Sequence, residues 1–132
     1  MIDEVTRKLS LSGIKKVGIL GTPSTLNSKL YQKALSKRRI ESIIPNNKQQ
    51  KILDKIIRNV LAGETKKKDI KRLINIADSL RFQGAEGILL GCTELPLIFP
   101  SEYSSPVYNS VEILSMVLLR KYYESNTIKK NL

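Results

Sequence analysis

The stretch GAEGILLGCTELP, residues 84–96, decides the fold and contains the only cysteine of the chain. Its unbroken apolar run, residues 87–90, is typical of a strand buried on both faces of a parallel sheet. Cys92 follows this strand directly, at the carboxyl end where open α/β sheets bind their ligands. Gly91 predicts a tight turn and a close approach of a ligand to the backbone. A lone cysteine is more often an inert buried thiol, but the hydroxyl and carboxylate that follow it favour a reactive one.

Outward from this stretch, strand and helix patterns alternate along the chain. Short apolar runs predict strands at residues 16–20, 40–44, 87–90 and 106–108. Apolar residues at helical spacing predict helices at residues 2–11, 26–37, 49–61, 69–83 and 110–123. This order predicts an α/β fold with three layers, α/β/α, and a mostly parallel sheet of about four strands. We expect residues 1–132 to form a single domain, with a polar tail at residues 125–132 that frays.

Composition sets limits on the class of protein. The 132 residues are 41% hydrophobic and 27% charged, which is typical of a soluble globular protein. No apolar stretch approaches the roughly 20 residues of a membrane span, and the amino end has no apolar signal core. A cytoplasmic location is the expectation, and a single cysteine excludes an internal disulfide. The chain has no histidine, so a Cys-His pair or a Ser-His-Asp triad within it is excluded.

The net charge of +11 raises the alternative of a nucleic-acid-binding domain. Basic side chains supply the salt-dependent affinity of such proteins. The lysines are scattered over predicted helix faces, however, and no aromatic stacking motif accompanies them. A solvated basic surface is therefore favoured, and nucleic acid is not an expected partner.

A second polar cluster, Gly21-Thr22-Pro23-Ser24-Thr25, follows the predicted strand at residues 16–20. It precedes a predicted helix, so hydroxyls and free backbone amides meet at a helix start. Such a turn can hold an anion. N-capping by Thr22, Ser24 or Thr25 explains the same pattern equally well.

These segments resemble one known family. Residues 84–96 look like the second cysteine motif of the aspartate/glutamate racemases, which invert the Cα of acidic amino acids without pyridoxal phosphate. Residues 13–31 (GIKKVGILGTPSTLNSKLY) are similar to the segment that opens the second lobe of these enzymes, and residues 106–110 resemble their last strand. The resemblance extends over about residues 2–123. It implies one lobe of a two-lobe racemase fold.

The resemblance also implies roles for individual residues. Cys92 would be one acid/base, and Thr22, Thr25 and Thr93 would bind the carboxylates of aspartate or a related acidic amino acid. Glu94 would either support the thiol or cap the following turn. No cofactor is implied.

What the chain lacks bears on its activity. The family has two similar lobes with one catalytic cysteine each, and the Cys-Asn-Thr motif of the first lobe has no counterpart here. Inverting a Cα requires a base on one face and a proton donor on the other, so we expect a homodimer or a separate first lobe as partner. A catalytically inactive remnant or a module that binds acidic metabolites is the alternative. Asn109 stands where the family commonly has an aspartate, so no carboxylate role is inferred there.

Overall fold

The computed structural model describes the backbone of residues 2–130 and the side chains of residues 2–126. Its strands form one parallel sheet in the order β2-β1-β3-β4. The strands are β1 (Lys16–Leu20), β2 (Glu41–Ile43), β3 (Ile88–Leu90) and β4 (Val107–Asn109). The central pair is in register with Gly18 opposite Ile88 and Leu20 opposite Leu90. The predicted α/β class with a parallel sheet of about four strands is confirmed.

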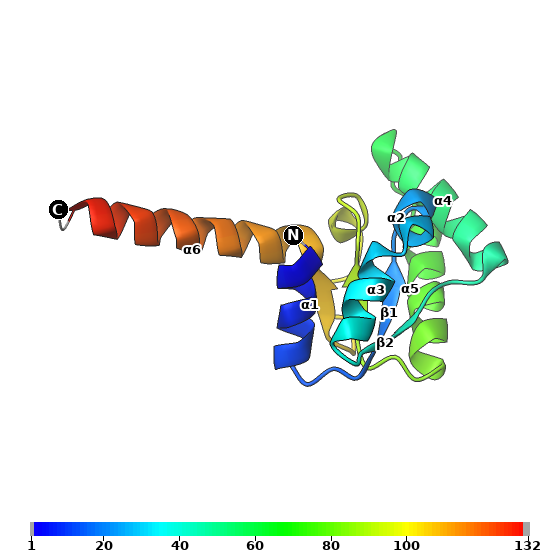
Figure 1. Ribbon diagram of the computed structural model, residues 1–132. Coiled ribbons are helices and arrows are strands. Elements are labelled where there is room, and N and C mark those ends of the chain that lie inside the picture. Colours follow the sequence, from blue (N-terminus) through cyan, green and yellow to red (C-terminus); the bar gives the residue numbers. More distant parts are fainter. Residues whose placement is uncertain (1, 131–132) are drawn as a thin grey trace.

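Helices cover both faces of this sheet and give the three expected layers (Figure 1). The helices are α1 (Ile2–Leu11), α2 (Pro23–Ser28), α3 (Leu30–Lys37), α4 (Asn47–Leu61), α5 (Lys67–Phe82) and α6 (Ser110–Lys130), with a short 3-10 turn, η1 (Leu95–Leu97). One buried cluster joins α1, α2 and α3 to the sheet, and the beginning of α6 packs at its edge. The other joins α4, α5 and η1 to the opposite face.

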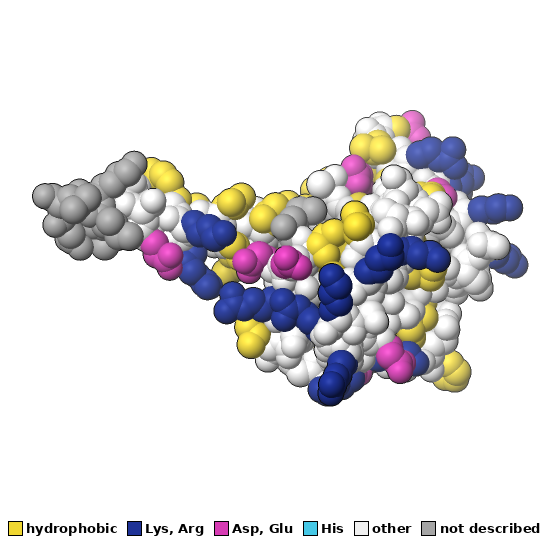
Figure 2. All heavy atoms as spheres, viewed as in Figure 1, with side chains coloured by type: hydrophobic (Ala, Val, Ile, Leu, Met, Phe, Trp, Pro, Cys, Tyr) yellow, Lys and Arg dark blue, Asp and Glu magenta, His cyan; other side chains and the backbone are white. Residues whose placement is uncertain are grey.

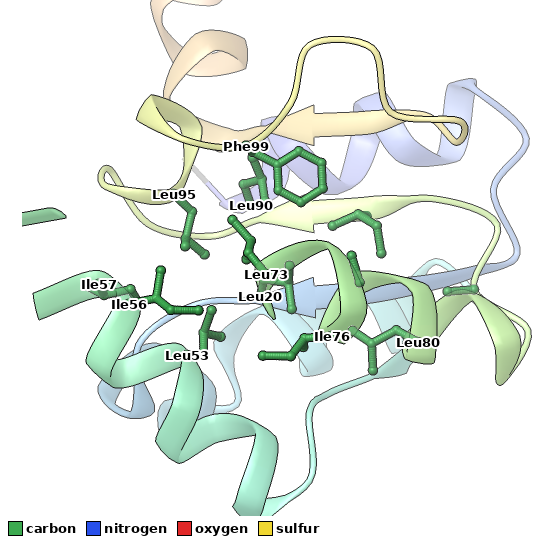
Figure 3. Packing of buried hydrophobic residues seen from close by; sticks show 13 residues of the cluster. Leu20, Leu53, Ile56, Ile57, Leu73, Ile76, Leu80, Leu90, Leu95 and Phe99 are labelled. Atoms are coloured by element: carbon green, nitrogen blue, oxygen red, sulfur yellow. The ribbon is translucent and has the colours of Figure 1, made fainter. Parts of the chain in front are cut away.

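Residues of β1 alternate between these two clusters. Val17 and Ile19 face α1 and α3, whereas Leu20 packs with the residues of α4 and α5. Figure 3 shows Leu20 among the leucines and isoleucines of this second cluster. Gly18 allows the close approach of α5, because a Cβ there would lie 2.9 Å from Leu80 Cδ1.

The prediction of one continuous helix at residues 26–37 is wrong, because this segment belongs to two helices, α2 and α3. Lys29 adopts a left-handed conformation with φ of 58° between α2 and α3. The Ser28 hydroxyl bonds to the Thr25 carbonyl at 2.7 Å and accepts from the Leu30 amide at 3.4 Å. Local bonds of this kind compete with the helical pattern and interrupt it.

The last helix is longer than predicted. Helix α6 begins at Ser110 as expected but continues to Lys130, past the predicted end at residue 123. The tail predicted at residues 125–132 is therefore helical up to Lys130, and residues 131–132 lie outside the described residues. Asn109 supports the start of α6, since its Oδ1 accepts from the amides of Val111 and Glu112 at 3.0 and 3.2 Å. After its first turns the helix extends away from the sheet (Figure 1).

Candidate active site

The carboxyl ends of the two central strands bring the two predicted polar clusters together. Gly91 continues the pairing of β3 with β1, because its amide donates to the Leu20 carbonyl at 2.8 Å. The Thr25 side chain lies against both strand ends. Its Cγ2 would be 3.6 Å from a Cβ on Gly21 and 3.7 Å from a Cβ on Gly91. The turn that follows β1 and the cysteine turn that follows β3 are therefore neighbours.

Thr22 is the residue that caps α2. Its Oγ1 accepts from the Thr25 amide at 3.3 Å and lies 3.0 Å from Thr25 Oγ1. N-capping thus accounts for Thr22, and neither Ser24 nor Thr25 occupies the cap position. Each hydroxyl has one proton, and the bond between the two oxygens uses only one of them. One hydroxyl of the pair consequently keeps a proton to donate to a ligand.

Cys92 is half-buried and packs against the cluster of α4, α5 and η1. Burial raises the pKa of its thiol, because the thiolate would lose solvation. The amides of Leu95 and Glu94 donate to the sulfur and lower the pKa, whereas the Glu94 carboxylate raises it through its charge and through a hydrogen bond from the thiol. The balance leaves the pKa raised. A raised pKa favours the protonated thiol, which is the form of a proton donor.

Glu94 occupies the N-cap position of η1, but its side chain does not cap the turn. Helix η1 begins at Leu95, and the Glu94 side chain makes no capping hydrogen bond. Its Oε1 instead accepts from the hydroxyl of Thr93 at 2.8 Å. The Glu94 carboxylate therefore provides no capping hydrogen bond, and it instead acts on the Cys92 thiol. Thr93 is exposed, and its hydroxyl is directed to Glu94.

Gly91 does not need the conformational freedom of glycine. The positive φ angles among the described glycines belong to Gly13, Gly63 and Gly84. A Cβ at Gly91 would lie 3.5 Å from Leu20 O and from Tyr31 Cε2, which is ordinary contact. The turn expected to require a glycine is thus accessible to other residues, and Gly91 instead leaves space beside Tyr31.

Two residues near the site were given no role from the sequence. Gln50, at the beginning of α4, donates through Nε2 to the Gly21 carbonyl at 3.0 Å and to Asp54 at 2.8 Å. Tyr31, at the beginning of α3, lies with its ring beside Gly91. Gln50 lies on the polar side of a helical pattern, so no local pattern indicated a role for it. Tyr31 stands in the family-like segment 13–31, but nothing there indicated its hydroxyl.

Within the described residues, no group of three or more His, Cys, Asp or Glu side chains could hold a metal ion. In the same part of the chain, no helix is long and apolar enough to cross a membrane.

Comparison with known proteins places this chain in one family. The sequence matches the family described as Asp/Glu/Hydantoin racemase over residues 1–117. It is 29% identical over 130 residues to a protein of Pectobacterium carotovorum subsp. carotovorum described as an uncharacterized protein in the pnlA 3′ region, covering 96% of this chain and 86% of that one. The chain belongs to the Asp/Glu/hydantoin racemase family.

Solved structures agree with this assignment. The chain is similar to an aspartate racemase homologue from Pyrococcus horikoshii OT3, with a TM-score of 0.82 and 33% identity over 90% of this chain and 53% of that one. It is also similar to the aspartate racemase of Picrophilus torridus, with a TM-score of 0.80 and 31% identity over 91% of this chain and 50% of that one. The chain thus spans about half the length of these solved structures, which fits one lobe of the racemase fold.

Proposed function

We propose that this protein is an amino-acid racemase in which Cys92 transfers the α-proton of aspartate or a related acidic amino acid. The observation that carries the proposal is that Cys92 follows β3 directly, and that β3 pairs with β1, at whose carboxyl end the hydroxyls of Thr22 and Thr25 lie 3.0 Å apart. Membership in the racemase family supports the reaction type. The names of the two archaeal relatives support an acidic substrate.

The chemistry assigns each group a task. A free hydroxyl of the Thr22–Thr25 pair donates to the substrate carboxylate, which stabilises the charge that develops when the α-proton leaves. A thiolate on one face takes that proton and becomes a thiol. A thiol on the opposite face gives its proton to the Cα and becomes a thiolate, so atoms and charge balance. No organic cofactor is needed for this sequence of steps.

The second thiol comes, in this proposal, from a second copy of the chain. One chain contains a single cysteine. Because the chain spans about half of the solved racemase structures, two copies restore the length of a two-lobe enzyme. A symmetric pair would place one Cys92 on each face of a substrate bound between the copies.

Helix α6 provides the surface for this pairing. Its apolar residues lie on nearly all sides of the helix, and a helix of this kind is usually buried. Met116, Leu118, Leu119 and Tyr122 are all exposed, and Figure 2 shows hydrophobic side chains along the part of α6 that projects from the body. A groove of about 190 Å³ between α1 and α6 continues this surface onto the body of the protein. In the proposed dimer, a second copy covers the exposed apolar side chains of α6 and the groove between α1 and α6.

The test follows the α-proton by NMR. We would incubate L-aspartate, D-aspartate and both glutamates with the protein in D2O, and compare the wild type with Cys92→Ala. The expected result is loss of the α-proton signal and interconversion of enantiomers, both dependent on Cys92. Binding without exchange would overturn the racemase proposal and leave a module that binds acidic metabolites. Exchange from one enantiomer without interconversion would show that the second thiol is missing from the pure protein.

A mixing experiment tests whether the two thiols belong to two copies. Wild type and Cys92→Ala are mixed in equal amounts after reversible dissociation. If each site needs two copies of Cys92, racemisation per total protein falls to about one quarter, because random pairing leaves one pair in four with two thiols. A fall to about one half would mean that each chain acts alone, and would refute the shared site.

A further inference from the structure

A groove between α1 and α3 lies outside the cysteine site. The two helices lie side by side on one face of the sheet (Figure 1) and share a buried cluster. The groove between them has a volume of about 560 Å³, which is within the range of about 300–1,000 Å³ that is typical of small-molecule sites. None of the residues that line it belongs to the turns around Cys92 and Thr22.

A buried threonine holds an arginine at this groove. Arg38 donates through Nε to Thr6 Oγ1 at 3.1 Å. Thr6 is completely buried in the middle of α1, and its hydroxyl donates to the Asp3 carbonyl at 3.1 Å. The guanidinium is therefore fixed through one of its nitrogens. Its two Nη atoms have no partner among the described residues, and their N–H groups are available to a ligand.

The lining of the groove has an excess of positive charge. Lys33 and Lys37, one helical turn apart on α3, line it together with Arg38. None of these three side chains forms a salt bridge within the described residues. Asp3 is the one carboxylate among the described residues that line the groove, so three cations and one anion leave a net charge of +2. A phosphate monoester, with about −1.5 to −2 charges at pH 7, matches this value.

The apolar part of the lining lies at the opposite end. Both helices lead into strands of the parallel sheet on the same face, so they run in the same direction. Ile2 and Leu30 stand at the beginnings of α1 and α3, whereas Arg38 follows the end of α3. Leu30 is 56% exposed. A ligand with an anionic group at Arg38 would therefore cover apolar surface with the rest of its structure.

We propose that the α1–α3 groove binds a phosphate monoester with an apolar or aromatic body. The Nη atoms of Arg38 donate to two phosphate oxygens, which is the usual geometry of guanidinium–phosphate pairs. Lys33 and Lys37 neutralise the remaining charge, and the body of the ligand covers Leu30. Thr6 is a positioning residue, because it fixes the direction of the guanidinium. This site goes beyond the racemase proposal and does not rest on it.

Calorimetric titration tests the class of ligand. The probes are phenyl phosphate and adenosine 5′-monophosphate, and inorganic phosphate and phenol each supply one part of the phenyl ester. We expect at least one ester to bind, and phenyl phosphate to bind about tenfold more tightly than either part. Equal affinity for inorganic phosphate would overturn the role of the apolar end. Equal affinity for phenol would overturn the role of the basic end, and no binding of either ester at about 10 mM would overturn the site.

Replacing the arginine tests the role of its guanidinium. Arg38→Gln should weaken binding of the ester about tenfold or more, because hydrogen bonds between charged groups are lost. Arg39→Gln is the matched control, since Arg39 is the next residue, is exposed and lines a different groove. An equal loss in the control would mean that only net charge matters, and would contradict the proposal.

Two further variants separate binding from folding. Lys33→Gln changes an exposed side chain on α3 and should also weaken binding, with an unchanged circular dichroism spectrum and melting temperature. Thr6→Val removes the acceptor of Arg38 Nε and should weaken binding less than Arg38→Gln does. Unchanged affinity in both Arg38→Gln and Lys33→Gln would overturn the proposal whatever the stability of the variants.

NMR of protein labelled with 15N shows where the ester binds. The amide shifts caused by phenyl phosphate should be concentrated in α1 and α3, and L-aspartate should not displace the ester. Shifts centred on Thr22 and Cys92, or displacement by L-aspartate, would place the phosphate at the cysteine site and overturn the proposal. Because these measurements follow binding alone, a failure of racemase activity would leave their outcome unaffected.

Discussion

Replacing Leu118 and Leu119 of α6 by serine tests whether this helix forms the interface between two copies. The two side chains are 57% and 55% exposed in the single chain. Each thus has roughly 80 Å² of apolar surface to bury, which is worth about 2 kcal/mol at about 25 cal/mol per Å². A symmetric pair buries both leucines twice, for a gross contribution of about 8 kcal/mol. Because reorganisation and retained contacts reduce such sums, we expect about half, which weakens the dimer about a thousandfold.

Sedimentation velocity over a range of protein concentrations measures this change directly. Circular dichroism checks that the helices persist in the variant. Leu61→Ser is the matched control, since Leu61 is 68% exposed at the end of α4 and lies away from α6. The control should leave the dimer intact. The same dimer constant in the α6 variant and the wild type, or a wild type that is monomeric at every concentration, would refute the argument and favour a separate first lobe as the partner.

Three other predictions concern the thiol and the glycines of the sheet. Glu94→Gln removes the carboxylate that raises the pKa of Cys92, so iodoacetamide should alkylate the thiol faster at pH 7 than in the wild type. Because the folded pKa of Cys92 lies above its ordinary value of 9.0, the unfolded chain loses this proton first as the pH rises. Stability to urea should therefore fall above about pH 9 in the wild type, and this part of the fall should be absent in Cys92→Ala. Gly18→Ala should destabilise the fold by about 1–3 kcal/mol through overpacking against Leu80, whereas Gly91→Ala should be nearly neutral for stability.

Each of these predictions has a result that contradicts it. Glu64→Gln, a change on an exposed residue after α4, should leave the alkylation rate unchanged. If Glu64→Gln accelerated alkylation as much as Glu94→Gln, the effect would come from the change in net charge and not from the contact of Glu94 with Cys92. Identical pH profiles for the wild type and Cys92→Ala would mean that burial does not raise the thiol pKa. Equal stability of the two glycine variants would contradict the close packing at Gly18, where a Cβ would lie 2.9 Å from Leu80 Cδ1.

The sheet and the position of Cys92 were predictable because they depend on short-range patterns. An apolar run between glycines predicts a strand buried on both faces, and the strand at residues 87–90 differs from β3 by a single residue. Chain order then places Cys92 at the carboxyl end of that strand. The neighbouring position of Thr22 and Thr25 follows from the parallel pairing of β1 with β3, which alternating strands and helices predict.

The break between α2 and α3 was not predictable in the same way. The apolar residues Leu26, Tyr31 and Leu35 continue at nearly helical spacing across it and are all buried. A left-handed conformation is usually indicated by a glycine or an asparagine, whereas this position is a lysine, Lys29. This conformation coincides with hydrogen bonds that Ser28 makes to its sequence neighbours Thr25 and Leu30. Similarly, the Tyr31 hydroxyl is buried without a partner among the described residues, which is a property of its surroundings that no local pattern records.

The protonated thiol and the exposed apolar helix lead to the same conclusion about how the site is completed. A two-base reaction needs one thiol and one thiolate, yet the surroundings of Cys92 in a single chain favour the thiol. When two copies face each other, the two thiols form a coupled pair, in which the first proton leaves more easily than the second because two thiolates repel each other. Repulsion raises only the second pKa, however, and burial has already raised the pKa of each thiol. In the proposed dimer, a positively charged substrate ammonium between the two thiols would therefore have to stabilise the first thiolate, so substrate binding and formation of the reactive thiolate would be coupled.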